Sequence, residues 1–140
     1  MKKESSYNPE GYPDPTAEAA VNRVLSEAPR YRPLVYICSP FAGDIAGNVQ
    51  RARAYCRFAI MQSAIPLAPH LLFPQFMDDS NEAERELGLF MGLVLLRYCK
   101  EVWVFGNALS AGMEREVARA EKRGIPVRYF TVQCKEVIHV

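Results

Sequence analysis

Short apolar segments alternate with longer helical segments along most of the chain, and this alternation constrains the fold more than any other feature. The apolar segments are rich in β-branched and aromatic residues, as buried strands are, and they occupy residues 32–38, 65–69, 101–106 and 125–130. Segments with helical periodicity lie between them, at residues 48–64, 83–99 and within 108–126. No hairpin signal such as Asn-Gly joins neighbouring segments, which favours βαβ units.

The sequence therefore predicts an α/β fold: a doubly wound, flavodoxin- or Rossmann-like parallel sheet of four to five strands with flanking helices. Residues 133–140 form either the fifth strand or an edge extension of the sheet. The helical segment 83–99 is apolar nearly all round, so we expect it to be deeply buried or to lie in a subunit interface. Residues 70–82 are predicted to be a long loop with aromatic and acidic side chains.

The first thirty residues differ in character from the rest of the chain. Residues 1–13 are polar and contain prolines and a glycine, which indicates a flexible arm. Asp14 followed by Pro15 is typical of the N-cap and first position of a helix. We expect residues 1–30 to form this arm and helix, attached to an α/β domain at residues 31–140. The basic start has no apolar run behind it, so it is not a signal peptide.

The composition argues against several classes of partner. The 140 residues fit a single core, and the formal net charge of +1 gives no general attraction to nucleic-acid polymers or anionic membranes. No apolar segment is long enough to cross a membrane. The cysteines lack the spacing of a zinc site or a disulfide framework; they are Cys38, Cys56, Cys99 and Cys134. We therefore expect a cytoplasmic protein with neither metal nor cofactor.

Ligands of doubly wound sheets bind beyond the carboxyl ends of the strands, which directs attention to the loops at residues 39–47, 69–79 and 106–112. In the first loop, Ser39 and Gly43 would let the backbone approach a ligand closely, and Asp44 would add a carboxylate. The alternative is an ordinary turn with Asp44 exposed. These residues alone favour that alternative, because the loop matches no phosphate-binding motif.

The second loop carries one histidine and several aromatic residues. His70 directly follows a strand end, where a lone histidine is more often structural than catalytic. Phe73 and Phe76 either stack on a planar base or anchor the loop. The residues alone favour neither interpretation.

The third loop leads into a helix whose start suits an anion. Free backbone N–H groups at a helix start attract phosphate, and Ser110 can cap the helix or donate its hydroxyl to that anion. Glu116 lies about one and a half turns farther, at the edge of the inward stripe formed by Met113, Val117 and Ala120. It is either a carboxylate that acts on a phosphorylated ligand or a boundary residue paired with a neighbouring arginine.

Two segments together resemble a known family. "VYICSPF" at residues 35–41 and "SAGMEREVARAEKRGIPV" at residues 110–127 resemble the nucleoside 2-deoxyribosyltransferase superfamily, which includes nucleotide N-hydrolases that cleave deoxynucleoside monophosphates. Its members pair Tyr-x-x-x-Pro-Phe/Tyr after the first strand with a later Gly-x-x-x-Glu, the spacing of Gly112 and Glu116. The segments "YICSP", "APHLLFPQF" and "S-x-GM-x-x-E" are most similar to a bacterial and phage branch. The resemblance covers roughly residues 33–130.

The resemblance implies a reaction. Glu116 would attack the anomeric carbon of a (deoxy)ribosyl group and form a covalent glycosyl-enzyme, which water or a second base then resolves. Ser110 and Gly112 would hold a 5′-phosphate, and serine at position 110 favours a nucleoside monophosphate over a nucleoside. The residues expected to contact substrate are Tyr36, Ser39, Pro40, Phe41, Gly43, Asp44, His70, Asn107, Ser110, Gly112 and Met113.

The resemblance also bears on assembly and on the departing base. Tyr36, Ser39 and Phe41 would line the sugar and base pocket, while candidates for the acid that assists the base are Asp44, Asp78 and Asp79. Superfamily members complete their sites across subunits, which implies a homodimer or a larger homo-oligomer. The alternatives to an enzyme are a non-catalytic nucleotide-binding or sensing module on the same fold, and an interaction protein with a vestigial cleft.

Overall fold

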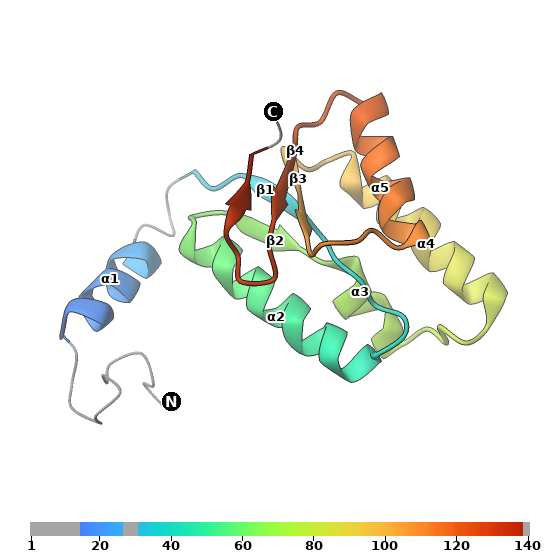
Figure 1. Ribbon diagram of the computed structural model, residues 1–140, viewed down its shortest axis with the longest axis horizontal. Helices are drawn as coiled ribbons and strands as arrows, with labels where there is room; N and C mark the ends of the chain where they lie inside the picture. The colour runs from blue at the N-terminus through green and yellow to red at the C-terminus, as the bar shows by residue number, and fades with distance from the viewer. Residues whose placement is uncertain (1–14, 27–30, 139–140) are drawn as a thin grey trace. The chain divides into compact units, whose positions relative to one another are not determined.

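The computed structural model describes residues 15–26 and 31–138 (Figure 1). The chain divides into two compact units, residues 1–32 and 33–140, which are described separately. In the first unit, helix α1 spans Pro15–Ser26, and the Ser26 hydroxyl donates to the Arg23 carbonyl oxygen at 2.9 Å. The predicted arm and the N-cap at Asp14 lie outside the described residues.

The second unit is built on a five-stranded sheet with the strand order β2-β1-β3-β4-β5. Its strands are β1 (Leu34–Cys38), β2 (Ile65–Leu67), β3 (Glu101–Phe105), β4 (Val127–Phe130) and β5 (Glu136–Val137). The first four are parallel, and β5 pairs antiparallel with β4. This arrangement confirms the predicted doubly wound α/β fold and makes the C-terminal segment an antiparallel edge strand.

Helices cover both faces of the sheet. They are α2 (Ile45–Met61), α3 (Pro69–Leu72), the 3₁₀ turn η2 (Phe73–Gln75), α4 (Glu82–Leu96) and α5 (Ala111–Lys122). Figure 1 shows α2 on one face of the sheet and α4 and α5 on the other. Parallel strands require crossover connections, because the chain must return to the same end of the sheet before the next strand begins, and the crossover helices cover the faces of the sheet.

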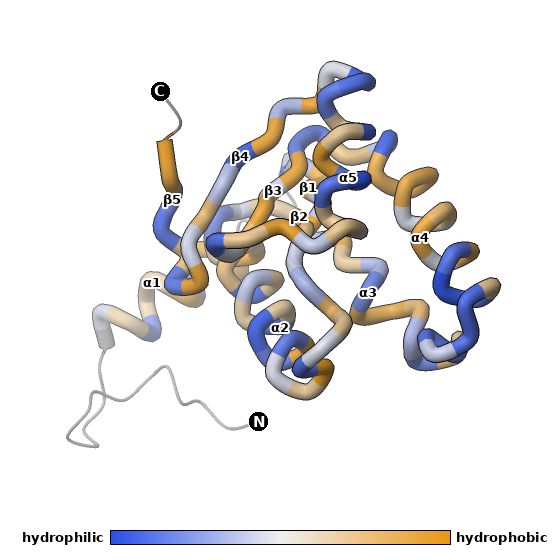
Figure 2. The backbone as a smooth tube through the Cα atoms, turned by 45° about the vertical axis from the view of Figure 1, so that its right-hand side comes forward, coloured by the Kyte–Doolittle hydropathy of each residue, from blue (hydrophilic) through white to orange (hydrophobic). Residues whose placement is uncertain are grey.

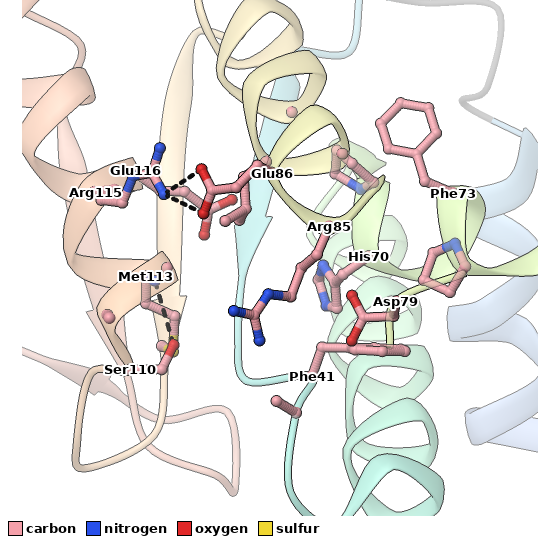
Figure 3. A pocket seen from close by; sticks show the side chains of 18 of the residues that line it. Phe41, His70, Phe73, Asp79, Arg85, Glu86, Ser110, Met113, Arg115 and Glu116 are labelled. Carbon is pink, nitrogen blue, oxygen red and sulfur yellow. Dashed lines mark hydrogen bonds and ion pairs between the residues drawn. The ribbon is translucent and has the colours of Figure 1, made fainter. Parts of the chain in front are cut away.

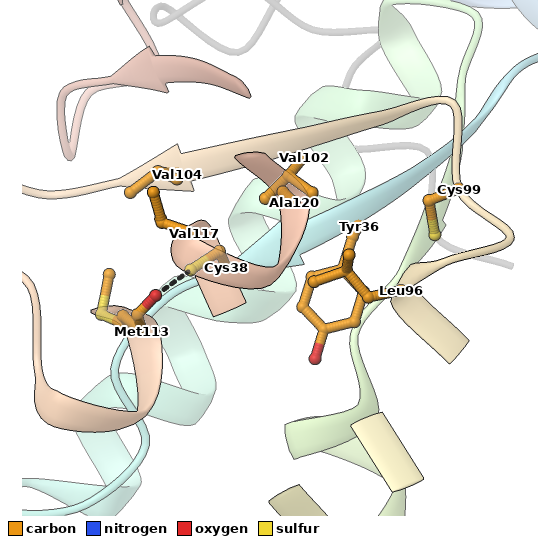
Figure 4. Close-up of a cluster of buried hydrophobic side chains, with 9 residues drawn as sticks. All are labelled: Tyr36, Cys38, Leu96, Cys99, Val102, Val104, Met113, Val117 and Ala120. Carbon is orange, nitrogen blue, oxygen red and sulfur yellow. Dashed lines mark hydrogen bonds between the residues drawn. The ribbon is translucent and has the colours of Figure 1, made fainter. Parts of the chain in front are cut away.

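Strand β1 sends alternate side chains to the two faces, as any strand does. Val35 and Ile37 pack with residues of α2 and with an aromatic cluster on β3 and β4. Tyr36 and Cys38 point the other way and join a second cluster, formed with residues of α4 and α5 (Figure 4). All four side chains are buried, so the register of β1 is fixed from both sides.

Two segments differ from their sequence prediction. Helix α2 begins at Ile45, before the predicted start at residue 48, because the Asp44 carboxylate caps it by accepting from the Gly47 amide at 3.1 Å. Residues 70–82, predicted to be a loop, begin instead with helical residues of α3 and η2. Pro69 at the first position of α3 has a backbone angle suited to a helix start, a signal that apolar periodicity misses.

The expectation that helix α4 is deeply buried within the protein was wrong. Only Gly92, Leu93 and Leu96 of this helix are buried, whereas Leu87 and Phe90 are 49% and 61% exposed. Figure 2 shows that α4 begins hydrophilic and becomes mostly hydrophobic farther along. The other expectation, a subunit interface, stays a prediction. Within the described part of the chain, no helix is long and apolar enough to span a membrane.

Candidate active site

A pocket of about 370 Å³ opens beyond the carboxyl ends of β1 and β2. Its walls come from the loop after β1, from α3 and η2, from α4 and from the first turns of α5. This volume is in the range of small-molecule sites, and the location is where ligands bind in doubly wound sheets. The pocket therefore gathers all three segments that the sequence singled out.

Glu116 on α5 lies at the pocket wall and faces β1. Ser110 begins this helix as its N-cap, and six residues later the helix has turned Glu116 toward the sheet. The Tyr36 hydroxyl donates a hydrogen bond to Glu116 Oε2, and Cys38 Sγ lies 3.4 Å from Oε1. Each oxygen of the carboxylate thus has its own donor from β1.

Burial controls the protonation of this cluster. Burial raises the pKa of Glu116 above its usual value, and hydrogen bonds from Tyr36 and Cys38 partly offset that rise. The pKa values of Tyr36 and Cys38 are raised well above their usual ranges, first by burial and then by the charge of Glu116. The phenol and the thiol therefore keep their protons, while Glu116 is the group that can ionise.

Helix α4 has a glycine at the place where Tyr36 approaches it. A Cβ added at Gly92 would lie 3.0 Å from the Tyr36 hydroxyl oxygen and 3.9 Å from Pro69. The first distance is shorter than ordinary van der Waals contact. Gly92 therefore leaves the space in which the phenol reaches Glu116.

A second polar pair lines the pocket between the first loop and α3. Ser39 Oγ and His70 Nε2 are 2.9 Å apart, and both residues contribute to the pocket wall. Burial lowers the pKa of His70 to about 4, so its imidazole is neutral at physiological pH. The pair supplies hydrogen-bonding groups without a charge, and Phe41 and Phe73 line the same pocket (Figure 3).

The start of α5 supplies the donors predicted for an anion. Ser110 Oγ accepts from the Met113 amide at 3.3 Å, which leaves the serine hydroxyl hydrogen available for a ligand. Ser110, Ala111 and Gly112 all line the pocket, and backbone N–H groups of a first helical turn have no partner within the helix. A Cβ at Gly112 would meet only Leu89, at 3.5 Å, so no steric clash requires glycine here.

Two arginines line the pocket that the sequence did not place there: Arg115, expected in an outer basic row of its helix, and Arg85. Arg115 pairs with Glu86 at 3.3 Å. Arg85 of α4 projects into the pocket in Figure 3, and its side chain makes no hydrogen bond or ion pair with residues 15–26 or 31–138. Helical spacing connects Arg85 with Leu89 and Gly92 on the pocket face, and this spacing was the signal that could have revealed it.

The comparisons with known proteins concern this same region. Residues 33–130 match the model of a family described as a domain of unknown function, DUF7768. The chain belongs to this family. No curated protein sequence matches the chain. Its fold is similar to that of a 2-deoxyribosyltransferase from the psychrotolerant bacterium Bacillus psychrosaccharolyticus, with a TM-score of 0.55 and 17% identity over 76% of this chain and 77% of that one.

The DUF7768 domain brings most, but not all, of the predicted contact residues to the pocket. Those that line it are Tyr36, Ser39, Phe41, His70, Ser110, Gly112, Met113 and Glu116. Four others are not part of its lining: Pro40, Gly43, Asp44 and Asn107. Asp44 instead caps α2 and pairs with Arg51 at 3.5 Å, and Gly43 adopts a φ of +88° in the turn before it. Asn107 is exposed.

The three candidates for the acid that protonates the departing base lie at different places in the DUF7768 domain. Asp78 is exposed and accepts from the Ser80 hydroxyl and amide, whereas Asp79 lines the pocket. Of Asp44, Asp78 and Asp79, only Asp79 is therefore in a position to meet a ligand there. Among residues 15–26 and 31–138, no cluster of three His, Cys, Asp or Glu side chains could hold a metal ion.

Proposed function

We propose that this protein cleaves or transfers the N-glycosidic bond of a (deoxy)nucleoside 5′-monophosphate, with Glu116 as the nucleophile. One observation carries the proposal: a carboxylate with a pKa raised by burial lies at the wall of a ligand-sized pocket, with hydrogen-bond donors on both oxygens. Perturbed carboxylates in clefts are concentrated at functional sites. The fold shared with a 2-deoxyribosyltransferase is compatible with this chemistry.

The reaction proceeds through two displacements at the anomeric carbon. A carboxylate oxygen of Glu116 forms a bond to this carbon as the carbon–nitrogen bond breaks, and the electron pair leaves with the base, which takes up a proton. Water or a second base then attacks the same carbon and returns the electron pair to Glu116. Tyr36 and Cys38 hold the carboxylate while it gives up and regains its charge.

The phosphate is proposed to bind between α5 and α4. The first turn of α5 offers backbone N–H groups and the Ser110 hydroxyl, and anions are favoured at such a position. Arg85 adds a positive charge with no acidic partner in the described residues. Two acids flank Arg85 in sequence and also line the pocket: Glu86 is paired with Arg115, and Glu84 accepts a hydrogen bond from the Asp78 amide.

The base is proposed to bind against the opposite wall. Phe41, Phe73 and Met77 provide apolar surface there, which suits the faces of a planar ring. The uncharged pair of Ser39 and His70 supplies hydrogen-bonding groups for the ring edge. Asp79, which lines the same pocket, is our candidate for the acid that protonates the departing base.

The proposal is tested by incubating the protein with a panel of nucleoside 5′-monophosphates and the matching nucleosides, and by measuring free base by chromatography. Release of base that is abolished in Glu116→Gln and retained in Glu114→Gln supports it. Glu114 is a suitable control because it is on the same helix but is exposed and not part of the pocket lining. Absence of release at high protein concentration, or undiminished release by Glu116→Gln, refutes it.

The same samples separate an enzyme from a nucleotide-binding or sensing module. A ligand that binds only the folded state raises the melting temperature. A monophosphate that stabilises the protein without losing its base would identify a binding module that uses the same pocket.

A further inference from the structure

Cys38 is a buried thiol that the proposed displacement does not itself require. It is two residues after Tyr36 on the same face of β1, and its side chain is fully buried. Unlike Tyr36, it does not line the pocket. Its Sγ lies 3.4 Å from Glu116 Oε1, whereas the Tyr36 hydroxyl reaches the other oxygen. A thiol is a weak donor, but here its acceptor is a carboxylate.

We propose that Cys38 is a positioning residue for Glu116, whose thiol hydrogen bond to Oε1 fixes the plane of the carboxylate and favours its ionised form. The catalytic consequence rests on the proposed function, but the contact itself does not. With Oε2 held by Tyr36 alone, the carboxylate could rotate about its terminal bond. A second donor on Oε1 removes that freedom and partly replaces the water that burial excludes.

The neighbouring acceptors and thiols support this assignment. The other acceptor near Cys38 is the Met113 carbonyl oxygen, at 3.9 Å, which is a longer contact than the 3.4 Å to Glu116. Cys99, a buried thiol three residues after the end of α4, instead contacts the Leu95 carbonyl oxygen in the last turn of that helix at 3.8 Å. Cys99 belongs to the same buried cluster as Tyr36 and Cys38 but is not among the groups that shift the pKa of Glu116. It therefore offers a matched control for the loss of a buried thiol from this cluster.

Few other charges bear on Glu116. Burial raises the pKa of Glu116, and the hydrogen bonds from Tyr36 and Cys38 lower it. From α4, Glu84, Arg85 and Glu86 line the same pocket, as does Asp79 before this helix. Glu86 is paired with Arg115 of α5, and Glu84 accepts from the Asp78 amide. His70 of α3 also lines the pocket, and because burial lowers its pKa to about 4 it is uncharged at neutral pH. A change in the titration of Glu116 on replacing Cys38 is therefore attributable to the thiol.

The variants Cys38→Val and Cys38→Ser separate donation from packing. Valine is apolar and cannot donate, although it carries one methyl group more than the thiol side chain. Serine can donate but is less apolar. We expect Cys38→Val to lower kcat by about three- to tenfold with little change in KM, because Cys38 does not line the pocket. The acidic limb of its pH–rate profile moves to higher pH, and Cys38→Ser restores both values toward wild type.

The decisive measurement is the titration of the Glu116 carboxyl, followed by infrared difference spectra against Glu116→Gln in each background. This readout requires no substrate, so it tests the role of Cys38 even if no nucleotide is cleaved. We expect a higher pKa in Cys38→Val than in wild type or Cys38→Ser, and no change in the Cys99→Val control. Equal titration in Cys38→Val and Cys99→Val would overturn the proposal. If Cys38→Val fails to fold, Cys38→Ala is compared with Cys99→Ala in the same way.

Discussion

A Cβ at Gly92 would lie 3.0 Å from the hydroxyl oxygen of Tyr36. Glycine inside a helix lowers stability by roughly 0.5–1 kcal/mol relative to alanine, and Gly92 is inside α4. The space left by the missing side chain is where Tyr36 passes on its way to Glu116. Helix α4 thus gives up some stability at the point where the carboxylate receives its main donor.

Replacing Gly92 with alanine should therefore impair activity more than folding. The added methyl group presses on the Tyr36 hydroxyl and lengthens its bond to Glu116. Hydrogen bonds to charged groups contribute about 1.5–3 kcal/mol, so we expect kcat/KM to fall roughly tenfold or more. The control is Gly88→Ala on the same helix, which also lines the pocket but where no heavy atom of the protein lies within 4 Å of the added Cβ. Equal kinetic effects of the two substitutions would contradict the prediction.

Neutralising Glu116 should stabilise the protein while it abolishes turnover. Burial raises the folded-state pKa of Glu116, so its stabilising contribution is complete below the unfolded pKa and is lost as pH rises through the folded pKa. Glu116→Gln avoids that loss. We expect it to exceed wild type by on the order of 1 kcal/mol at pH 8, with a smaller difference at pH 5, in urea unfolding. A stability gain that is independent of pH would point to packing instead.

His70 should give the protein an opposite dependence on pH. Its folded pKa is lowered to about 4, whereas the unfolded chain binds this proton near pH 6.5. The stability from neutral His70 is therefore complete above about pH 6.5 and is lost as the pH falls toward 4. Between pH 7 and pH 4, wild type should lose about 3 kcal/mol more unfolding free energy than His70→Gln. Parallel pH curves for the two proteins would refute this.

Arg85 should determine preference for a phosphorylated substrate. Replacing it with glutamine removes the charge but keeps hydrogen-bonding capacity. KM for a nucleoside monophosphate should then rise by roughly tenfold or more, with little change for the corresponding nucleoside. Arg57→Gln is a matched control, because Arg57 is an exposed residue outside the pocket lining. An equal rise in KM for the monophosphate and the nucleoside would show that Arg85 does not bind the phosphate.

The sheet could be predicted from sequence because its buried strands are continuous apolar segments separated by helical ones. The inward position of Glu116 on α5 could also be predicted, since helical spacing alone places it beside the buried residues Met113, Val117 and Ala120. The hydrogen-bond donors to Glu116 could not be predicted in this way. Tyr36 is 80 residues away in sequence, and the contact depends on how α5 lies across β1, which no local pattern specifies.

Other parts of the site were hidden by competing local roles. Asp44 follows a strand and precedes a helix, which suits either a ligand or a cap, and the cap is what the structure shows. Arg85 lies in a segment whose apolar residues suggest burial, so the sequence pattern did not indicate a charged side chain in the pocket. Only the packing of α4 beside α5 reveals which face of α4 meets the pocket.

The alternation of β1 has a consequence for engineering. Val35 and Ile37 meet α2, while Tyr36 and Cys38 meet α5 and its carboxylate. Substitutions on the α2 side change packing without touching the groups that hold Glu116. The α2 face is therefore where the protein can be redesigned for heat resistance while the chemistry on the opposite face of the same strand is left as it is.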